Sequence, residues 1–195
     1  MKPLAELLRR GRGLRAVGFD DAPFDKAPGS PVSVAGVVCR ETRLEGMLWG
    51  EAHRDGEDAT RVMRDMLLGS KFHAQVHLVL IDGLAIGGFN LVDLPALAEA
   101  VARPCVAVMR RPPNLPAVHR VLRRFEDAER RLALLERAGP IHELGGFVFQ
   151  VAGEAPEPVA QALAQLTDRG QVPEPLRLAH LIGSAVKLGQ SGKRA

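Results

Sequence analysis

The sequence predicts an α/β fold built on one mixed β-sheet, because its opening part and the remainder follow different patterns. Three strand-like segments come first, and connections this short imply antiparallel neighbours, since a parallel return needs a crossover of about a dozen residues. After them, helical apolar spacing alternates with short buried strands, which is typical of α/β units. The 195 residues suffice for one sizeable domain, which we place at residues 14–188. A basic segment at residues 1–13 and a flexible tail at residues 189–195 are expected to flank it.

The opening strands form an antiparallel meander in this prediction. They are expected at residues 14–19, 32–40 and 44–53, and a loop rich in proline and acidic residues joins the first two. The first helix is expected at residues 59–68, where apolar residues recur at helical spacing. Asp58 stands at its N-cap position and Gly69 ends it.

Strands and helices then alternate to the end of the domain. Residues 76–81 form a nearly continuous apolar run, which is typical of a strand covered on both faces, and residues 104–109 form another. Asp93 is placed to cap a helix at residues 94–102. The remaining elements are a helix at 116–138, a strand at 146–151 and helices at 158–168 and 175–188.

The helix expected at residues 116–138 carries many arginines on its outer face: Arg120, Arg123, Arg124, Arg130, Arg131 and Arg137. Four acidic residues accompany them, so we interpret the face as solvated and crossed by helical ion pairs rather than as a binding surface. Arginine makes up 21 of the 26 basic residues of the chain. Because the guanidinium group suits phosphate oxygens, either an anionic partner or a coding bias explains this preference.

Composition excludes several other classes of protein. A hydrophobic content of 46% with 25% charged residues is ordinary for a soluble globular protein. No apolar run approaches the roughly 18 residues of a membrane span, and the N-terminus is too basic for a secretory signal, so we expect a cytoplasmic protein with no membrane partner. Cys39 and Cys105 lie in apolar runs outside any C-x-x-C pair, which favours buried reduced thiols over a zinc site or a disulfide.

Acidic residues end two of the predicted strands. Asp20 follows the first strand and Asp82 the fourth. The order of elements is that of a ribonuclease H-like sheet, in which these strands are neighbours and the two carboxylates would lie roughly 5 Å apart. That separation suits a shared divalent cation, whereas two bare charges would repel. Both residues also have an interpretation as turn residues, and Asp58 has one as a helix cap.

A histidine near the C-terminus is the remaining candidate from the pattern of residues. His180 shares a face of the last helix with Arg177 and Ser184, by spacing of three and four residues. The apolar residues of that helix lie on the opposite face. His180 is therefore not expected in the core, and we treat it as a candidate site residue.

A series of short motifs runs along nearly the whole chain. They are Arg15-Ala-Val-Gly-Phe-Asp20-Asp21-Ala-Pro-Phe24, Gly36-Val-Val-Cys-Arg40, Asp55-Gly-Glu-Asp58-Ala-Thr60, Ser70-Lys-Phe72, Ile81-Asp-Gly83, Gly88-Phe-Asn-Leu-Val-Asp93 and Pro173-Glu-Pro-Leu-Arg-Leu-Ala-His180-Leu-Ile182. In this order they resemble the endonuclease dU family, which is distantly similar to endonuclease V. The link to endonuclease V rests on the motifs that contain Asp20, Asp82 and His180.

The resemblance implies a ribonuclease H-like fold and Mg²⁺-dependent hydrolysis of a phosphodiester at a deaminated base, with Mn²⁺ as an alternative cation. The implied partner is nucleic acid, with deoxyuridine in DNA as the expected substrate. By position, Asp20 and Asp82 match the metal-binding aspartates and His180 the C-terminal histidine. Asp58 stands where endonuclease V has a glutamate, which shortens its reach to the metal. The implied catalytic set is thus Asp20, Asp58, Asp82 and His180, with the three aspartates as metal ligands.

Two further expectations concern binding of the nucleic acid. Arg177, together with Arg12 and Arg15 of the basic N-terminal part, is expected to bind flanking phosphates. Endonuclease V is known for an aromatic wedge that includes tyrosine, whereas this chain has no tyrosine. The aromatic residues that remain as candidates for this role, or for core packing, are Phe24, Phe72, Phe89 and Trp49.

Two alternatives to the nuclease come from other classes of protein. One is a nucleic-acid-binding module with the same fold and no turnover, in which the acids bind metal weakly or cap helices. The other is a phosphatase of the Asp-x-Asp type, which also places an aspartate after its first strand. The phosphatase is disfavoured, because Ala22 stands where the second acid is needed and because the opening strands are antiparallel.

Overall fold

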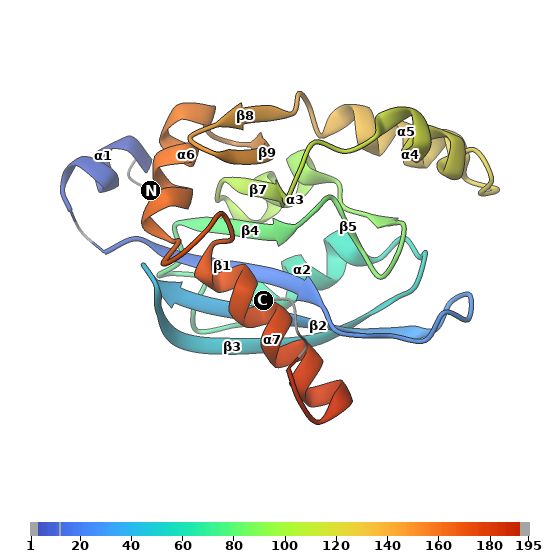
Figure 1. Cartoon of the computed structure of the whole chain (residues 1–195), viewed down its shortest axis with the longest axis horizontal. Helices are drawn as coiled ribbons and strands as arrows, with labels where there is room; N and C mark the ends of the chain where they lie inside the picture. The colour runs from blue at the N-terminus through green and yellow to red at the C-terminus, as the bar shows by residue number, and fades with distance from the viewer. Residues whose placement is uncertain (1–3, 12, 192–195) are drawn as a thin grey trace.

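Seven strands form the central sheet of the computed structural model, which describes residues 4–11 and 13–191 (Figure 1). In sheet order these are β3 (Arg43–His53), β2 (Pro31–Arg40), β1 (Arg15–Asp21), β4 (Leu78–Asp82), β7 (Cys105–Met109), β9 (Phe147–Ala152) and β8 (His142–Leu144). The opening strands are antiparallel, and β1 is parallel to β4. The predicted mixed sheet, with the first and fourth strands adjacent, is confirmed.

The strand directions define one functional edge of the sheet. Strand β4 is parallel to both β1 and β7, and β3 has the same direction because two antiparallel pairings separate it from β1. The last residues of β1, β3, β4 and β7 therefore lie along one edge, which we call the carboxyl edge. A short hairpin, β5 (Ala85–Ile86) with β6 (Asn90–Leu91), follows β4 at this edge.

Helices cover both faces of the sheet. The first core packs α2 (Ala59–Leu68) and α3 (Leu94–Val101) against alternate residues of β1 and β4, including Val17, Phe19 and Ile81. The second core packs α1 (Leu4–Arg9) and α6 (Pro156–Gln165) against the other face, which includes Ala16 and Leu80. Helix α7 (Glu174–Leu188) lies across β1 and β2 on this second face (Figure 1).

The close approach of α7 depends on a glycine in β1. A Cβ atom at Gly18 would lie 2.5 Å from the backbone carbonyl carbon of Pro175, so any side chain there would push the helix away. One strand period later, Asp20 faces the same helix. Gly18 thus brings the first turns of α7 against the strand that carries Asp20.

The long helix expected at residues 116–138 is wrong. The chain forms two helices instead, α4 (Leu115–Leu122) and α5 (Ala128–Arg137). In the break between them the ring of Phe125 lies 5.8 Å from the ring of Phe89 and beneath the guanidinium group of Arg131, 4.2 Å away. These tertiary contacts outweigh the helical propensity of the segment.

Several smaller elements and properties complete the comparison with the sequence. Helix α1 in the basic segment, strand β8 and the β5–β6 hairpin were not expected. Cys39 and Cys105 are free and buried, as predicted. Helix α7 ends at Gly189, and most of the predicted flexible tail falls outside the described residues. Within residues 4–11 and 13–191, no helix is long and apolar enough to span a membrane.

Candidate active site at the carboxyl edge

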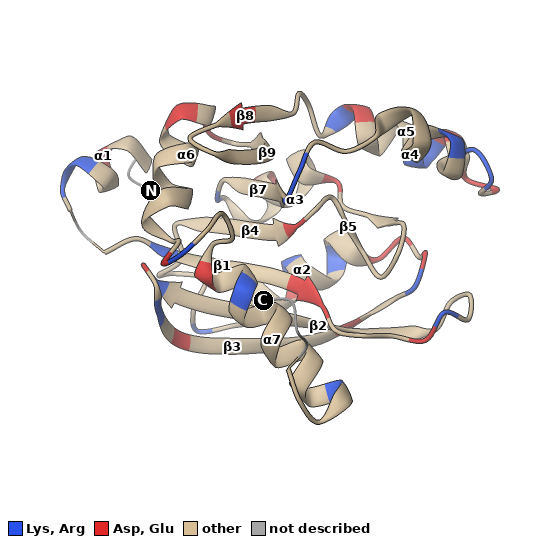
Figure 2. Ribbon diagram, viewed as in Figure 1, with Lys and Arg blue, Asp and Glu red and all other residues tan. Residues whose placement is uncertain are grey.

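Two aspartates meet at the carboxyl edge. Phe19 of β1 is in register with Ile81 of β4, so the next residues, Asp20 and Asp82, end adjacent parallel strands (Figure 2). Neighbouring strands lie about 4.8 Å apart, and side chains in register project to the same face. We call these two residues the acid pair. The predicted proximity of their strands is confirmed.

Asp20 is buried, and its carboxylate has two partners. Its side chain is 7% exposed, and Oδ1 accepts a hydrogen bond of 2.8 Å from the backbone N–H of Asp21. Oδ2 lies 2.9 Å from Nδ1 of His180, on α7. The sequence placed Asp20 and His180 in one site, and the packing of α7 over Gly18 brings them into contact.

The acid pair is strained electrostatically. Burial, together with the charges of Asp82 and Asp21, raises the pKa of Asp20 to about 8, against the opposing effects of the Asp21 N–H and Arg110. Burial also raises the pKa of Asp82, while Arg110 and His180 oppose that shift. Adjacent buried carboxylates are hard to ionise together unless a cation compensates them.

Two residues of this cluster were not selected from the sequence. Asp21 points to the opposite face of β1, where Oδ2 accepts a hydrogen bond of 2.5 Å from the N–H of Gly87; burial raises its pKa. Arg110 directly follows β7 and lines a small pocket with Asp82. The signal for Arg110 was available, since it follows a predicted buried strand just as Asp20 and Asp82 follow theirs.

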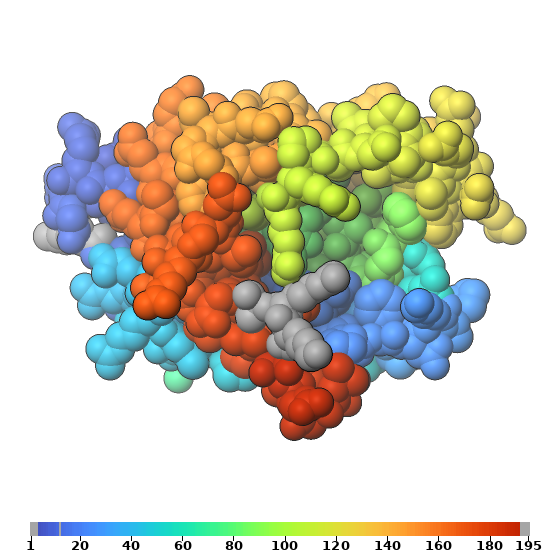
Figure 3. Space-filling model, in the orientation of Figure 1, coloured from blue at the N-terminus to red at the C-terminus, as the bar shows by residue number. Residues whose placement is uncertain are grey.

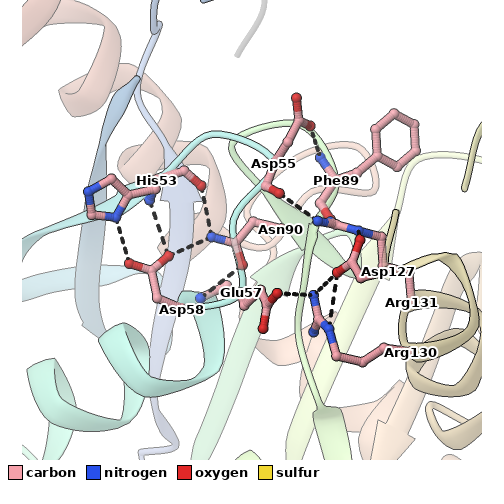
Figure 4. Close-up of polar contacts among 10 residues, drawn as sticks. His53, Asp55, Glu57, Asp58, Phe89, Asn90, Asp127, Arg130 and Arg131 are labelled. Carbon is pink, nitrogen blue, oxygen red and sulfur yellow. Dashed lines mark hydrogen bonds and ion pairs between the residues drawn. The ribbon is translucent and has the colours of Figure 1, made fainter. Parts of the chain in front are cut away.

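Asp58 belongs to a different network (Figure 4). Its Oδ2 lies 2.9 Å from Nδ1 of His53, and its Oδ1 accepts a hydrogen bond of 2.7 Å from Nδ2 of Asn90. Burial tends to raise the pKa of Asp58, but the hydrogen bonds from His53 and Asn90 outweigh it and lower the pKa. Asp58 stands at the N-cap position of α2 without a side-chain cap, because Asn90 Oδ1 accepts from the N–H of Ala59 instead.

A buried arginine joins this region to α5. Arg131 is 4% exposed and donates from Nη2 to the carbonyl oxygen of Asp55, at 2.6 Å, and from Nη1 to that of Phe89 (Figure 4). Its Nε donates to Asp127 at 2.6 Å. The interpretation of Arg131 as part of a solvated face is therefore wrong. Its guanidinium group satisfies two loop carbonyls.

Two of the three arginines expected to bind phosphate form ion pairs within the protein. Arg177 donates two hydrogen bonds, of 2.7 and 2.8 Å, to the carboxylate of Glu174. Arg15 pairs with Glu45 at 2.6 Å and begins β1, about 17 Å of strand away from Asp20. Arg12 lies outside the described residues. Arg15 and Arg177 thus already have carboxylate partners.

The acid pair fits a magnesium or manganese ion by its donor chemistry. Both residues supply carboxylate oxygens, which these cations prefer, and Mg²⁺ is commonly held by one or two carboxylates together with waters and substrate phosphates. Within the part of the chain that the structure describes, no group of three Asp, Glu, His or Cys side chains is arranged to hold an ion. The structure brings together two of the three predicted ligands and leaves Asp58 in its own network.

A sizeable cavity lies at the other edge of the sheet. It has a volume of about 450 Å³ and is lined by residues that include Leu4, His77 and Pro104, before the starts of β4 and β7. The cavity and the acid pair therefore lie at opposite edges of the sheet, and the two criteria for a functional site disagree. We place the candidate site at the acid pair, because adjacent carboxylates whose pKa values are raised by burial indicate a functional site more specifically than the size of a cavity does.

Comparison with known proteins shows the family to which the chain is related. The sequence matches the endonuclease dU family over residues 12–187. A UPF0215 protein of Methanothermobacter thermautotrophicus is 38% identical, over 91% of this chain and 90% of its own length. The crystal structure of a protein of unknown function from Archaeoglobus fulgidus is 35% identical and superposes with a TM-score of 0.84, over 89% of this chain and 98% of that one.

More distant structures show the fold. Endonuclease V of Bacillus subtilis has a TM-score of 0.59 at 10% identity, over 94% of this chain and 89% of its own. Endonuclease V of Ciona intestinalis, in complex with a 24mer DNA containing an inosine followed by a ribo-adenosine, has a TM-score of 0.57 at 14% identity, over 95% and 94% of the two chains. The fold is ribonuclease H-like, as predicted.

Proposed function

Because this chain belongs to the endonuclease dU family, we propose that it is a metal-dependent endonuclease that hydrolyses a phosphodiester in nucleic acid containing a deaminated base. Deoxyuridine in DNA is the proposed substrate. The observation that carries the proposal is the acid pair: two adjacent carboxylates at a sheet edge whose pKa values are raised by burial. Such a pair is costly for the fold unless it binds a cation.

The acid pair would hold Mg²⁺ or Mn²⁺. When bound there, the ion would neutralise charge on the phosphate and lower the pKa of a water ligand. Arg110 adds a fixed positive charge to the same site, since it opposes the raised pKa of both aspartates. Asp58, the third predicted ligand, would join them only by exchanging its contacts with His53 and Asn90.

His180 is proposed to hold or move a proton during hydrolysis. With Asp20 ionised, its carboxylate accepts the N–H of Nδ1 and leaves Nε2 free to take up or release a proton. The His180 side chain is 30% exposed, so the imidazole is open to solvent. Asp20 would thus orient the imidazole as well as contribute charge.

A non-catalytic nucleic-acid-binding module is the second candidate. One observation favours it: the described residues contain no complete group of three side chains that could hold a metal ion. In that case the acid pair would retain a proton at neutral pH, because the pKa of Asp20 is about 8. Such a protein would bind nucleic acid without cutting it.

Cleavage of end-labelled oligonucleotides separates the two candidates. The substrates would carry uracil, hypoxanthine or no lesion, as single strands and duplexes, with Mg²⁺, Mn²⁺ or EDTA. We expect metal-dependent cuts at uracil in DNA that are lost in Asp82→Asn. Asp65→Asn, on the exposed side of α2, is the matched control and should cleave normally. Binding without cleavage in any metal would reject the nuclease and favour the binding module.

A further inference from the structure

The positive charge of this protein is concentrated in one segment. Residues 110–124 contain five arginines and no acidic residue, whereas the whole chain has a net charge of +3. The rest of the chain therefore has a net charge of −2. We call residues 110–124 the arginine arm; it comprises the loop after β7, helix α4 and the residues that end it.

The arginines of α4 differ from those of α5 in their partners. Arg130 pairs with Asp127 and Glu57, and Arg137 pairs with Asp93 at 3.0 Å. Arg111, Arg120, Arg123 and Arg124 are exposed, and within the described residues none of them forms an ion pair or a side-chain hydrogen bond. The interpretation of a face crossed by ion pairs therefore applies to α5 and not to α4.

The arm begins at the acid pair and leads away from it. Arg110 is close enough to Asp20 and Asp82 for its charge to oppose their raised pKa values. Helix α4 follows at one end of the molecule, with α1 at the other (Figures 1 and 2). In Figure 3 the yellow-green and yellow residues of this part of the chain border a hollow on the face shown.

Three of the five arginines of the arm are clustered at the end of α4. Arg120 lies in the last turn of the helix, and Arg123 and Arg124 lie in the turn that directly follows it. An α-helix of eight residues is about 12 Å long, which corresponds to three or four nucleotides at a rise of about 3.4 Å per nucleotide. The buried contacts of Arg131 hold the adjoining helix α5 against the carboxyl edge, which fixes the position of α4.

We propose that the arginine arm binds the phosphate backbone of the nucleic acid strand that leads from the acid pair. The proposal rests on the proposed function. Unpaired guanidinium groups bind phosphate oxygens by paired hydrogen bonds, without reading the base sequence. The arm would position the strand over the acid pair, while lesion recognition would occur elsewhere.

The test measures binding separately from cleavage. Fluorescence anisotropy with a uracil-containing oligonucleotide in EDTA would compare the wild-type protein with Arg120→Gln/Arg123→Gln/Arg124→Gln. A matched control, Arg9→Gln/Arg10→Gln/Arg43→Gln, removes the same charge from α1 and the start of β3. We expect the arm variant to bind on the order of 10-fold to 100-fold more weakly and to lose about two units of the slope of log K against log salt. The control should lose less than about threefold.

Each other outcome overturns the proposal in a recognisable way. Equal losses in both variants would mean that only net charge matters, and no loss in the arm variant would mean that the strand runs elsewhere. If polyglutamate displaced the oligonucleotide as well as unlabelled DNA does, an acidic protein would be the better partner. Cleavage by the arm variant at high enzyme concentration would support the proposed nuclease activity independently of whether the arm binds the strand. Circular dichroism would check that the variants fold.

Discussion

The carboxyl edge holds two clusters of polar residues that shift the pKa of an aspartate in opposite directions. In the acid pair, burial and a second carboxylate raise the pKa of Asp20 to about 8. In the Asp58 network, hydrogen bonds from His53 and Asn90 lower the pKa of the aspartate. At Asp58 the hydrogen bonds outweigh the effect of burial, so this carboxylate has little need of a cation. At Asp20 burial and the second carboxylate outweigh the contacts with the Asp21 N–H and His180. The same residue type therefore serves structure in one place and is available for chemistry in the other.

The largest expected difference between the two clusters is in cleavage. Asp82→Asn should reduce the cleavage rate on the order of 1000-fold or more, because loss of a cation ligand removes several kcal/mol of transition-state stabilisation. The unfolding free energy should stay equal or rise, since the substitution removes a buried charge next to Asp20. Single-turnover cleavage and urea unfolding would measure both quantities. A variant that unfolds more easily and cleaves normally would reverse the assignment of the two clusters.

The pH dependence of stability should have opposite signs in the two clusters. The pKa of Asp20 is about 8 in the folded protein, against an ordinary value of 3.8 for an exposed aspartate, so between these pH values only the folded state holds the proton. The free energy of unfolding should therefore fall by about 1 kcal/mol per pH unit from pH 5 to 7 and level off above pH 8. The lowered pKa of Asp58 has the opposite effect on stability. The ionised carboxylate stabilises the folded protein above the pKa that Asp58 has in the unfolded chain, and this stabilisation is lost as the pH falls through its lower pKa in the folded protein.

Urea unfolding in EDTA at a series of pH values would test this difference. Asp20→Asn should reduce the decline between pH 5 and 7, because asparagine does not titrate and only Asp21 and Asp82, whose pKa values burial also raises, remain. Asp58→Asn should keep that decline and lose stability at neutral pH instead. The same decline in Asp20→Asn as in the wild type would show that another group causes it.

The Asp58 network should matter mainly for stability. Asn90 is fully buried and bonds to the carbonyl oxygen of His53, to Asp58 and to the N–H of Ala59. Asn90→Ala should lower the free energy of unfolding by about 2 kcal/mol, because it leaves buried polar groups unsatisfied. Cleavage at a temperature well below the unfolding transition should change by less than about tenfold. A loss as large as that of Asp82→Asn would instead assign the network to catalysis.

The smallest expected effect is stabilisation by the cation. Mg²⁺ at about tenfold its dissociation constant should stabilise the folded protein by about 1.4 kcal/mol, seen as a rise in the melting temperature. Asp82→Asn should abolish the rise, and Asp58→Asn should retain it. If both variants abolished it, Asp58 would join the acid pair as a ligand when the cation binds, as the sequence predicted.

The order of strands and the position of Asp20 and Asp82 followed from the sequence with little tertiary information. A continuous apolar run indicates a strand covered on both faces, and a polar residue directly after it marks the edge of the sheet. Short connections then required the antiparallel opening. Arg110 obeys the same rule after β7, so it was predictable in principle.

The helix at residues 116–138 and the role of Asp58 were not predictable in this way. Helical periodicity continues through Phe125, and only the contacts of its ring with Phe89 and Arg131 explain the break. Asp58 has the sequence position of a helix cap and of a metal ligand alike. Its partner Asn90 belongs to a hairpin 32 residues away in the chain, so no local sequence pattern predicts that contact.

The sequence by itself determined which residues alternate between the two faces of each strand, where the strands end and hence which acids reach the carboxyl edge. These properties depend on neighbours a few residues apart, so local spacing carries them. The tertiary structure alone decided at which of these acids burial outweighs the hydrogen bonds, which arginines are buried and which remain free to bind. Desolvation and hydrogen bonding between distant segments set those outcomes, and they exist only once the chain has folded.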